Sequence, residues 1–323
     1  MTSVADFKPS ASIEALKARA GLYQKIRQFF AERDVLEVET PILSQAAVTD
    51  VHLASISVNR HLNGQLQTGY LQTSPEFAMK RLVASGVGAI YQICKVFRDD
   101  EHGRKHNSEF SMLEWYRPQF NLLQLMQEVA DLLSTVFGHP VQPKILTYKQ
   151  AFLHRLDINP LTADLKTLKD TARRVGLNID LGEDRLAWLD LLFSHIVEPT
   201  LGAEYPVYLT DFPAEMASLA KVKLDEDGNR VAARFELYID GLELANAYDE
   251  LADAAEQARR FEADNLERQS RDLPVVPVDK NLLAALEQFP ECAGIALGLD
   301  RLLMVLLDTR RIDKVIAFVA DRA

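Results

Sequence analysis

Two segments that lie far apart in the chain combine residue types that suit phosphate chemistry. The first runs from Lys95 to Tyr116 and places Arg98 at the expected end of a strand, followed by a polar loop. The chain is then expected to return as a second strand that carries an aromatic ring, Phe110, and a carboxylate, Glu114. A guanidinium group can donate two parallel hydrogen bonds to phosphoryl oxygens. The first segment therefore supplies one of the cations that phosphoryl chemistry needs.

The second segment runs from Gly294 to Arg301 and continues into an apolar run. A short apolar strand is expected to end at Gly298, and a helix that carries Arg301 is expected to follow. During phosphoryl transfer, negative charge builds up on the phosphoryl oxygens, so preorganised guanidinium groups and Mg²⁺ are the expected stabilisers. The two segments together therefore supply cations of the kind that phosphoryl transfer uses.

These segments resemble motifs 2 and 3 of the class II aminoacyl-tRNA synthetases, in which two arginines from different elements clamp a bent ATP. The resemblance implies that Arg98 holds the α-phosphate and Arg301 the γ-phosphate, and that Phe110 stacks on adenine. It also implies that the loop at His106 and Asn107 positions the nucleotide.

Each arginine also has a simpler explanation when it is considered alone. Arg98 has Asp99 and Asp100 beside it, and Arg301 has Asp300 beside it, so each could form a local ion pair. The presence of both motifs in the family's order favours the ATP site.

The segment Glu243-Leu-Ala-Asn246 is expected to hold magnesium. In the family the matching Glu and Asn bind Mg²⁺ and the ATP phosphates, and Mg²⁺ usually takes one or two carboxylates plus substrate phosphates. A solvated strand edge is the alternative, and strand alternation puts Glu243 and Leu244 on opposite faces. The resemblance as a whole assigns catalysis to Arg98 and Arg301, metal binding to Glu243, and ATP binding to Arg98, Asp100, His106, Asn107, Phe110, Glu243, Leu244, Asn246, Gly298 and Arg301.

Three carboxylates fall at positions that line the amino-acid pocket in lysyl-tRNA synthetases. They are Glu76, Glu114 and Glu250, and Tyr116 lies with them. Converging carboxylates repel each other unless a cation joins them. A substrate with two ammonium groups meets that need, whereas aspartate or asparagine does not. The resemblance implies that Glu76 binds the amino group near the substrate carboxylate and that Glu250 and Tyr116 bind the distal one.

Two further positions bear on this pocket. Thr73-Ser74-Pro75-Glu76 resembles the substrate-binding turn of the lysyl, aspartyl and asparaginyl subclass, although a serine N-cap followed by proline is also a plain helix start. Ala296 stands where true synthetases carry glycine. One methyl group beside a substrate is worth about 1–3 kcal/mol of discrimination, which is enough to change the isomer of lysine that fits.

The remaining elements are expected to form an antiparallel-sheet α+β domain with flanking helices over residues 1–323. A helix at 12–33, a strand at 35–40 and Pro41 resemble class II motif 1, which forms the dimer interface, so a homodimer is expected. Helices dominate from about 142 to 201 (148–156, 165–175 and 186–197), and this stretch is expected to be an inserted helical subdomain. Another amphipathic helix is expected at 122–137, strands at 207–210 and 234–239, and a charged helix at 253–271.

Composition restricts the partners. The net charge is −11, from 47 acidic against 36 basic residues, whereas extended nucleic-acid binding needs an excess of cations. The two cysteines, Cys94 and Cys292, have no paired spacing, so neither a disulfide framework nor a zinc site is indicated. No secretory signal and no apolar run of membrane-spanning length occur, so a cytoplasmic protein is expected.

The resemblance covers the chain from Ser12 onward, and only a short segment precedes motif 1. The chain is most similar to the truncated lysyl-tRNA synthetase paralogues that lack an anticodon domain and modify elongation factor P. The implied reaction is ATP-dependent activation of (R)-β-lysine, or lysine, as its adenylate and ligation to a lysine ε-amine of elongation factor P. Two departures are Asp100, where the family usually has glutamate, and Ala247, where the nearest paralogues have glycine.

Two other functions remain open at this point. One is a free-standing synthetase that charges tRNA or an amide-forming ligase, against which the acidic pocket, the net charge and the missing anticodon domain argue. The other is a catalytically silent paralogue that regulates a partner, against which the intact Arg98, Glu243 and Arg301 argue.

Overall fold

The computed structural model describes residues 7–99 and 101–323, so Asp100, an expected nucleotide contact, lies outside the described residues. The strands are β1 (Leu36–Glu37), β2 (Leu43–Ser44), β3 (Ser57–Leu62), β4 (Gln65–Leu71), β5 (Ile90–Phe97), β6 (Glu109–Pro118), β7 (Lys144–Thr147), β8 (Val207–Pro213), β9 (Val222–Leu224), β10 (Arg230–Ile239), β11 (Leu242–Asp249) and β12 (Cys292–Gly298). The α-helices are α1 (Ile13–Ala31), α2 (Glu76–Ala84), α3 (Leu122–Phe137), α4 (Tyr148–Leu156), α5 (Leu165–Arg174), α6 (Arg185–Leu192), α7 (Ala254–Ser270), α8 (Lys280–Leu286) and α9 (Leu299–Leu306).

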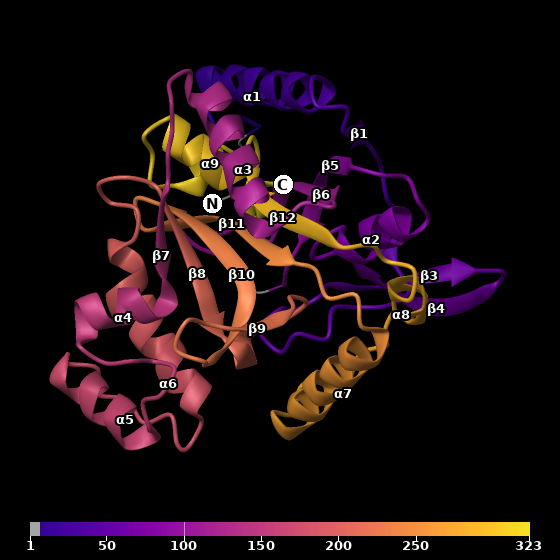
Figure 1. Cartoon of the computed structure of the whole chain (residues 1–323). Coiled ribbons are helices and arrows are strands. Elements are labelled where there is room, and N and C mark those ends of the chain that lie inside the picture. The colour runs from indigo at the N-terminus through magenta and orange to yellow at the C-terminus, as the bar shows by residue number, and fades with distance from the viewer. Residues whose placement is uncertain (1–6, 100) are drawn as a thin grey trace, which may run out of the picture.

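In the described part of the chain, nine strands form the main sheet in the order β1-β5-β6-β12-β11-β10-β8-β7, with β9 paired to β10. The central pairs are antiparallel, whereas β1 with β5 and β7 with β8 are parallel. The predicted α+β class with an antiparallel sheet is confirmed, and a parallel pair at each end makes the sheet mixed. A separate three-stranded sheet, β2-β4-β3, projects beside α2 (Figure 1).

The first helix follows the predicted signals. The Ser12 hydroxyl accepts a hydrogen bond from the Ala15 N–H at 3.2 Å, and Glu14 lies in the first turn, where a carboxylate suits the helix dipole. The strand predicted at 35–40 was too long, because only Leu36–Glu37 forms a ladder with β5 before the chain turns at Pro41.

The two segments with the arginines fold as their sequences predict. Arg98 directly follows β5, and β6 returns antiparallel to it with Phe110 opposite Val96. Strand β12 ends at Gly298, which caps α9, so Arg301 lies in the first turn of that helix. Because β6 and β12 are neighbouring strands, the two segments that carry Arg98 and Arg301 lie side by side in the sheet, although they are distant in the sequence.

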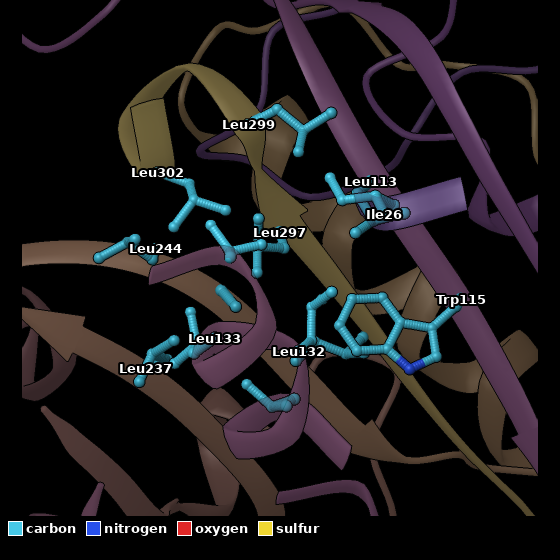
Figure 2. Close-up of a cluster of buried hydrophobic side chains, with 14 of the residues drawn as sticks. Ile26, Leu113, Trp115, Leu132, Leu133, Leu237, Leu244, Leu297, Leu299 and Leu302 are labelled. Atoms are coloured by element: carbon cyan, nitrogen blue, oxygen red, sulfur yellow. The ribbon is translucent and has the colours of Figure 1, made fainter. Parts of the chain in front are cut away.

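One face of the sheet is covered by α1, α3 and α9, which gather on the same side (Figure 1). Figure 2 shows the apolar cluster beneath them, where Trp115 and Leu113 of β6 lie near Leu297 of β12 and Leu132 of α3. These side chains alternate along each strand with residues of the opposite face, as a pleated strand requires. The opposite face is therefore left free of these helices to form a site.

The segment from 142 to 201 begins with the short strand β7 and continues as α4, α5 and α6 beside β8 (Figure 1). These helices have an apolar cluster of their own, built around Phe152, Trp188 and Phe193. A π-helical turn, Phe193–Val197, extends α6 and leads into a 3₁₀ turn, Glu198–Thr200. Within residues 7–99 and 101–323, no helix combines the length and apolar character needed to cross a bilayer.

Candidate active site

All of the predicted site residues that the structure describes line one cavity of about 1730 Å³ on the uncovered face of the sheet. They come from β6, β11, β12, α2, α9 and the loop after β5. They are Ser74, Glu76, Arg98, His106, Asn107, Phe110, Glu114, Tyr116, Glu243, Leu244, Asn246, Glu250, Ala296, Gly298 and Arg301.

Arg98 lies at the mouth of the β5–β6 hairpin. Its backbone N–H donates to the Ser108 carbonyl at 2.9 Å, which fixes the start of the loop. Its guanidinium carbon lies 5.1 Å from the centre of the Phe110 ring, and one nitrogen lies 3.4 Å from the Glu101 carboxylate. The described ion pair of Arg98 is therefore with Glu101 and is long enough to be exchanged for a phosphate.

Arg301 points away from its sequence neighbour Asp300. It donates to the Glu243 carbonyl at 2.7 Å, lies 3.5 Å from the Glu243 carboxylate, and contacts His106 Nε2 at 2.7 Å. Asp300 instead pairs with Arg19 and accepts from the Ser111 N–H at 2.6 Å. The simpler explanation of Arg301 as a partner of Asp300 is therefore wrong. Burial, followed by the charge of Arg301, lowers the pKa of His106, so this imidazole is kept neutral.

A bulge decides which residues of β11 face the cavity. Leu237 of β10 pairs with Ala245, but Tyr238 pairs with Glu243, so Leu244 is an extra residue in β11. This extra residue brings Glu243 and Asn246 to the same face, although strict alternation would put them on opposite faces. The Leu244 side chain packs in the apolar cluster shown in Figure 2, so only its main chain is available to a nucleotide.

Strand β10 contributes residues that the sequence reasoning missed. Arg234 donates to the Asn246 side-chain oxygen at 2.9 Å and forms an ion pair with Glu236, whose other oxygen accepts from Tyr238. Asn246 in turn donates to the Tyr248 hydroxyl at 2.9 Å. This network orients Asn246. The alternation of Arg234, Glu236 and Tyr238 with apolar residues was the available signal, since it marks one polar face of a buried strand.

Asn107 has a structural task beside the cavity. Its amide nitrogen donates to the Glu109 carbonyl at 2.6 Å, and its oxygen accepts from the Ala320 N–H at 3.0 Å. The side chain is almost fully buried, so it ties the hairpin loop to the C-terminal segment. Both polar atoms of its side chain are therefore already engaged by main-chain groups.

At the other end of the cavity, the three predicted carboxylates converge. One Glu114 oxygen accepts from the Ser74 hydroxyl and the other from the Tyr116 hydroxyl, each at 2.7 Å. Ser74 was predicted to bind substrate, with a helix N-cap as the alternative; the cap position of α2 is Pro75, and the Ser74 hydroxyl accepts from the Glu76 N–H at 3.0 Å while it donates to Glu114. Burial raises the pKa of Glu114 to about 8, with the charge of Glu76 adding to the shift.

Lys80 is the residue of this cluster that the sequence reasoning missed. Its ammonium lies 2.6 Å from Glu76 Oε1 and 2.6 Å from Glu250 Oε2, and its side chain is 1% exposed. The chain therefore supplies one of the cations that were expected to come only from the substrate. The spacing of Glu76 and Lys80, one helical turn apart, was a signal for this pair.

Strand β12 forms the floor beneath the carboxylates. Gly294 pairs with Tyr116 and Tyr248, and Ala296 pairs with Glu114 and Asn246. A β-carbon at Gly294 would lie 2.3 Å from Glu250 Oε1 and 2.5 Å from Tyr116 Cε1. Glycine is required at position 294 because the Glu250 and Tyr116 side chains occupy the space that a β-carbon would fill.

Glu198 is a further cavity residue that was not predicted. Two glycines at positive φ let the segment around Glu198 approach β10 and β11 closely. A β-carbon at Gly202 would lie 2.5 Å from the Tyr238 carbonyl oxygen, and a β-carbon at Gly241 would lie 3.0 Å from the Pro199 carbonyl oxygen. Burial, followed by the charge of Glu243, raises the pKa of Glu198 to about 7.

The donors present suit a metal that arrives with its own ligands. Within the described residues, no group of three or more His, Cys, Asp or Glu side chains could hold a metal ion by itself. Glu243 offers a partly exposed carboxylate to the cavity. Because Mg²⁺ commonly binds through one or two carboxylates plus substrate phosphates, this single carboxylate fits Mg²⁺ delivered as its ATP complex.

Comparison with known proteins agrees with this geometry. A family model described as tRNA synthetases class II (D, K and N) matches residues 2–322. The chain belongs to this family. Two curated relatives share 49% identity with it over their whole length and the whole of this chain, one from Edwardsiella ictaluri (strain 93-146) and one from Salmonella typhi. Both are named elongation factor P--(R)-beta-lysine ligase.

The family membership confirms the resemblance on which the prediction rested. The chain is an ATP-dependent ligase of the class II synthetase family, with the α+β fold of that class.

Proposed function

We propose that this enzyme activates (R)-β-lysine with ATP and ligates it to the ε-amine of a lysine of elongation factor P. The observation that carries the proposal is the buried carboxylate cluster at one end of a cavity whose other end holds two arginines. The names of the relatives support the choice of amino acid and acceptor.

The reaction requires two displacements. The amino-acid carboxylate attacks the α-phosphorus of ATP, the bond to the β-phosphate breaks, and pyrophosphate leaves. The acceptor ε-amine, as the free base, then attacks the carbonyl carbon of the adenylate, loses a proton and releases AMP. Positioning and charge stabilisation supply most of the catalysis in such phosphoryl chemistry.

Arg98 and Arg301 suit the first displacement. Their carboxylate partners, Glu101 and Glu243, lie 3.4 and 3.5 Å away. Phosphate oxygens can replace these carboxylates with little loss of free energy, because partly exposed ion pairs are weak. Arg98 would hold the α-phosphate and Arg301 the γ-phosphate, while the Phe110 ring takes adenine in place of the Arg98 guanidinium. The neutral His106 would support the Arg301 guanidinium without adding a competing positive charge.

Glu243 would bind Mg²⁺, and Asn246, held by Arg234 and Tyr248, would contact the phosphates. When bound, the metal neutralises charge on the polyphosphate. The backbone of Leu244 and Gly298 and the loop at His106 would complete the nucleotide contacts.

Substrate choice would depend on the carboxylate cluster and the β12 floor. Glu76 would take the amino group near the carboxylate, while Glu250 and Tyr116 would take the distal one, with Ser74 and Glu114 between them. The Ala296 methyl lies on the cavity side of β12, since its neighbours Ile295 and Leu297 are in the core. That position supports a role in selecting the β-isomer.

The size of the cavity supports a macromolecular acceptor. A pocket for a small ligand commonly measures about 300–1,000 Å³, and this cavity is larger. It extends from the sheet to Asp184 at the start of α6 and to Arg271 at the end of α7, whose side chains lie 3.3 Å apart. We propose that the acceptor lysine enters between these helices when the exposed Arg271–Asp184 ion pair, which costs little to break, has opened.

Two structural proposals accompany this function. We propose a homodimer formed through the motif 1 region, where Ile13 and Leu36 are large exposed apolar side chains. We also propose that residues 142–201 are an insertion that forms one wall of the acceptor entrance, since Asp190, Ser194 and Glu198 line the cavity.

Intact-mass measurement tests the function directly. Purified elongation factor P, incubated with the enzyme, ATP, Mg²⁺ and (R)-β-lysine, should gain the mass of one lysyl residue. A variant of the factor without its acceptor lysine should gain none. Transfer to tRNA with no change in the mass of elongation factor P would contradict the proposal.

A further inference from the structure

Lys80 stands behind the substrate pocket rather than in it. Its side chain does not line the cavity, yet its ammonium touches Glu76 and Glu250, two of the three carboxylates that do. The third carboxylate, Glu114, is held by the hydroxyl groups of Ser74 and Tyr116 instead. The cation therefore acts on the pocket through the carboxylates and cannot reach a substrate itself.

The charges of this cluster match a particular class of ligand. When all groups are ionised, the three carboxylates and the Lys80 ammonium leave two net negative charges. A substrate with two ammonium groups neutralises them, whereas without Lys80 one negative charge would be left over. Uncompensated charge in a site this dry is unfavourable, so the carboxylates would take up protons instead.

We propose that Lys80 is a positioning residue that holds Glu76 and Glu250 in place, favours the ionised form of Glu250, and so sets the pocket to receive an amino acid with two ammonium groups. The inference rests on the proposed function and adds a residue that makes the recognition of a lysine-like substrate possible. Removing the ammonium should raise the pKa of Glu250 further, so that the carboxyl stays protonated to higher pH. A protonated carboxyl is a poor partner for an ammonium group.

The titratable groups around Glu250 come from three elements: Lys80 and Glu76 of α2, Glu114 and Tyr116 of β6, and Cys292 of β12. Burial raises the pKa of Glu250 to about 8, and Lys80 is the largest influence that lowers it. Burial also keeps Tyr116 and Cys292 protonated, since the pKa of each is raised. Binding of an amino acid with two ammonium groups should therefore release protons from Glu114 and Glu250, and affinity should rise with pH until the carboxylates are ionised.

Calorimetric titration of (R)-β-lysine and of α-lysine from pH 6 to pH 9, without ATP, tests the proposal. Lys80→Met should bind either amino acid at least about tenfold more weakly than wild type at pH 7.5. The midpoint of its rise in affinity with pH should move to a higher pH by about one unit. Lys80→Arg keeps the charge and should retain the wild-type midpoint. Norleucine, which lacks the distal ammonium, should bind wild type and Lys80→Met with similar affinity.

Lys149→Met is the matched control, because Lys149 pairs with Asp227 outside the cavity and should leave every curve unchanged. Should Lys80→Met fail to fold, the double variant Lys80→Met/Glu76→Gln removes one charge of each sign. It should show a smaller shift in the same direction, because Lys80 influences Glu250 more than Glu76 does.

Two results would overturn the inference. Unchanged affinity and midpoint in Lys80→Met, or tighter binding of lysine, would show that Lys80 only supports the fold or competes with the substrate. If wild type itself binds neither lysine isomer, the proposed function fails as well, so the two failures can be told apart.

Discussion

The two ends of the cavity differ in how firmly their charges are held before any substrate binds. At the phosphate end, Arg98 and Arg301 are 25% and 23% exposed and lie 3.4 and 3.5 Å from their carboxylate partners. At the amino-acid end, Lys80 and Glu250 are each 1% exposed and lie 2.6 Å apart. Arg301 is also held at 2.7 Å by the Glu243 carbonyl and by His106, so the looser feature of the first end is its pairing with carboxylates, whereas the pair at the second end is close and buried.

This difference indicates separate tasks. Exposed ion pairs contribute little to stability and exchange easily, which suits groups that must release carboxylates to grip a polyphosphate. Buried pairs are strongly destabilising to break, which suits a site that must reject the wrong amino acid. Substitutions at the phosphate end should therefore reduce rate, and those at the amino-acid end should change selectivity, protonation and stability.

The largest effect is expected at the phosphate end. Arg301→Ala removes a guanidinium that would stabilise charge on the γ-phosphate, so lysine-dependent ATP–pyrophosphate exchange should fall by about 10²–10³-fold. Arg310→Ala is the control, since Arg310 pairs with Asp240 at an exposed site outside the cavity. Exchange at the wild-type rate in Arg301→Ala would show that the ATP assignment is wrong.

At the amino-acid end, Glu250→Gln should weaken lysine-like substrates by about 2–5 kcal/mol, because a buried counter-charge is lost. Norleucine should be affected far less. Glu128→Gln is a matched control, since Glu128 is also buried but bonds Trp115 and Arg117 away from the cavity. Equal losses for lysine and norleucine would reveal a purely structural Glu250.

Ala296→Gly should narrow the preference for (R)-β-lysine over α-lysine by about tenfold to a hundredfold, as one methyl in a tight site allows. The measurement is the ratio of kcat/KM for the two isomers. Ala293→Gly, in the buried core of the same strand, should leave that ratio unchanged. If the kcat/KM ratio is the same in Ala296→Gly and wild type, Ala296 does not contribute to the choice of isomer.

Gly294→Ala should destabilise the protein by about 1–3 kcal/mol, because the new methyl collides with Glu250 and Tyr116. Its affinity for lysine should fall while ATP binding is kept. Gly21→Ala, where a methyl meets open space on α1, should be neutral or slightly stabilising. Thermal unfolding of both variants and of wild type measures the difference. Equal stability of Gly294→Ala and wild type would show that Glu250 and Tyr116 can move to accommodate the methyl group.

The smallest effect is a pH dependence of stability. Burial raises the pKa of Glu114 to about 8 from an ordinary value of 4.5, so the folded protein holds a proton that the unfolded chain has lost. This contribution is fully present below pH 4.5 and is lost as pH rises through about 8. Relative to Glu114→Gln, wild type should therefore lose about 1–2 kcal/mol of unfolding free energy between pH 7 and pH 9. The unfolding free energies of wild type and Glu114→Gln are measured by urea unfolding. If their difference does not change with pH, Glu114 is already ionised in the folded protein.

The sequence by itself determined the family, the elements that carry the arginines, and the predicted site residues that share the cavity. Helix α1 and its Ser12 cap, the β5–β6 hairpin and the strand-to-helix turn at Gly298 all follow local rules of capping, alternation and turn formation. Such rules act over a few residues, so the printed sequence contains them in full. The expectation that Arg98 and Arg301 share one cavity followed from their motifs and agrees with the structure.

Only the tertiary structure decided which groups meet across elements. Strict alternation would have separated Glu243 from Asn246, and the bulge at Leu244, visible only in the pairing with β10, puts both on one face. Lys80 belongs to the carboxylate cluster because α2 packs against β6 and its ammonium reaches Glu250 beyond the end of β11, and no local pattern shows that its partner besides Glu76 is Glu250. A side chain's charge is visible in the sequence, but the charge that opposes it depends on which distant segment the fold brings within a few ångströms.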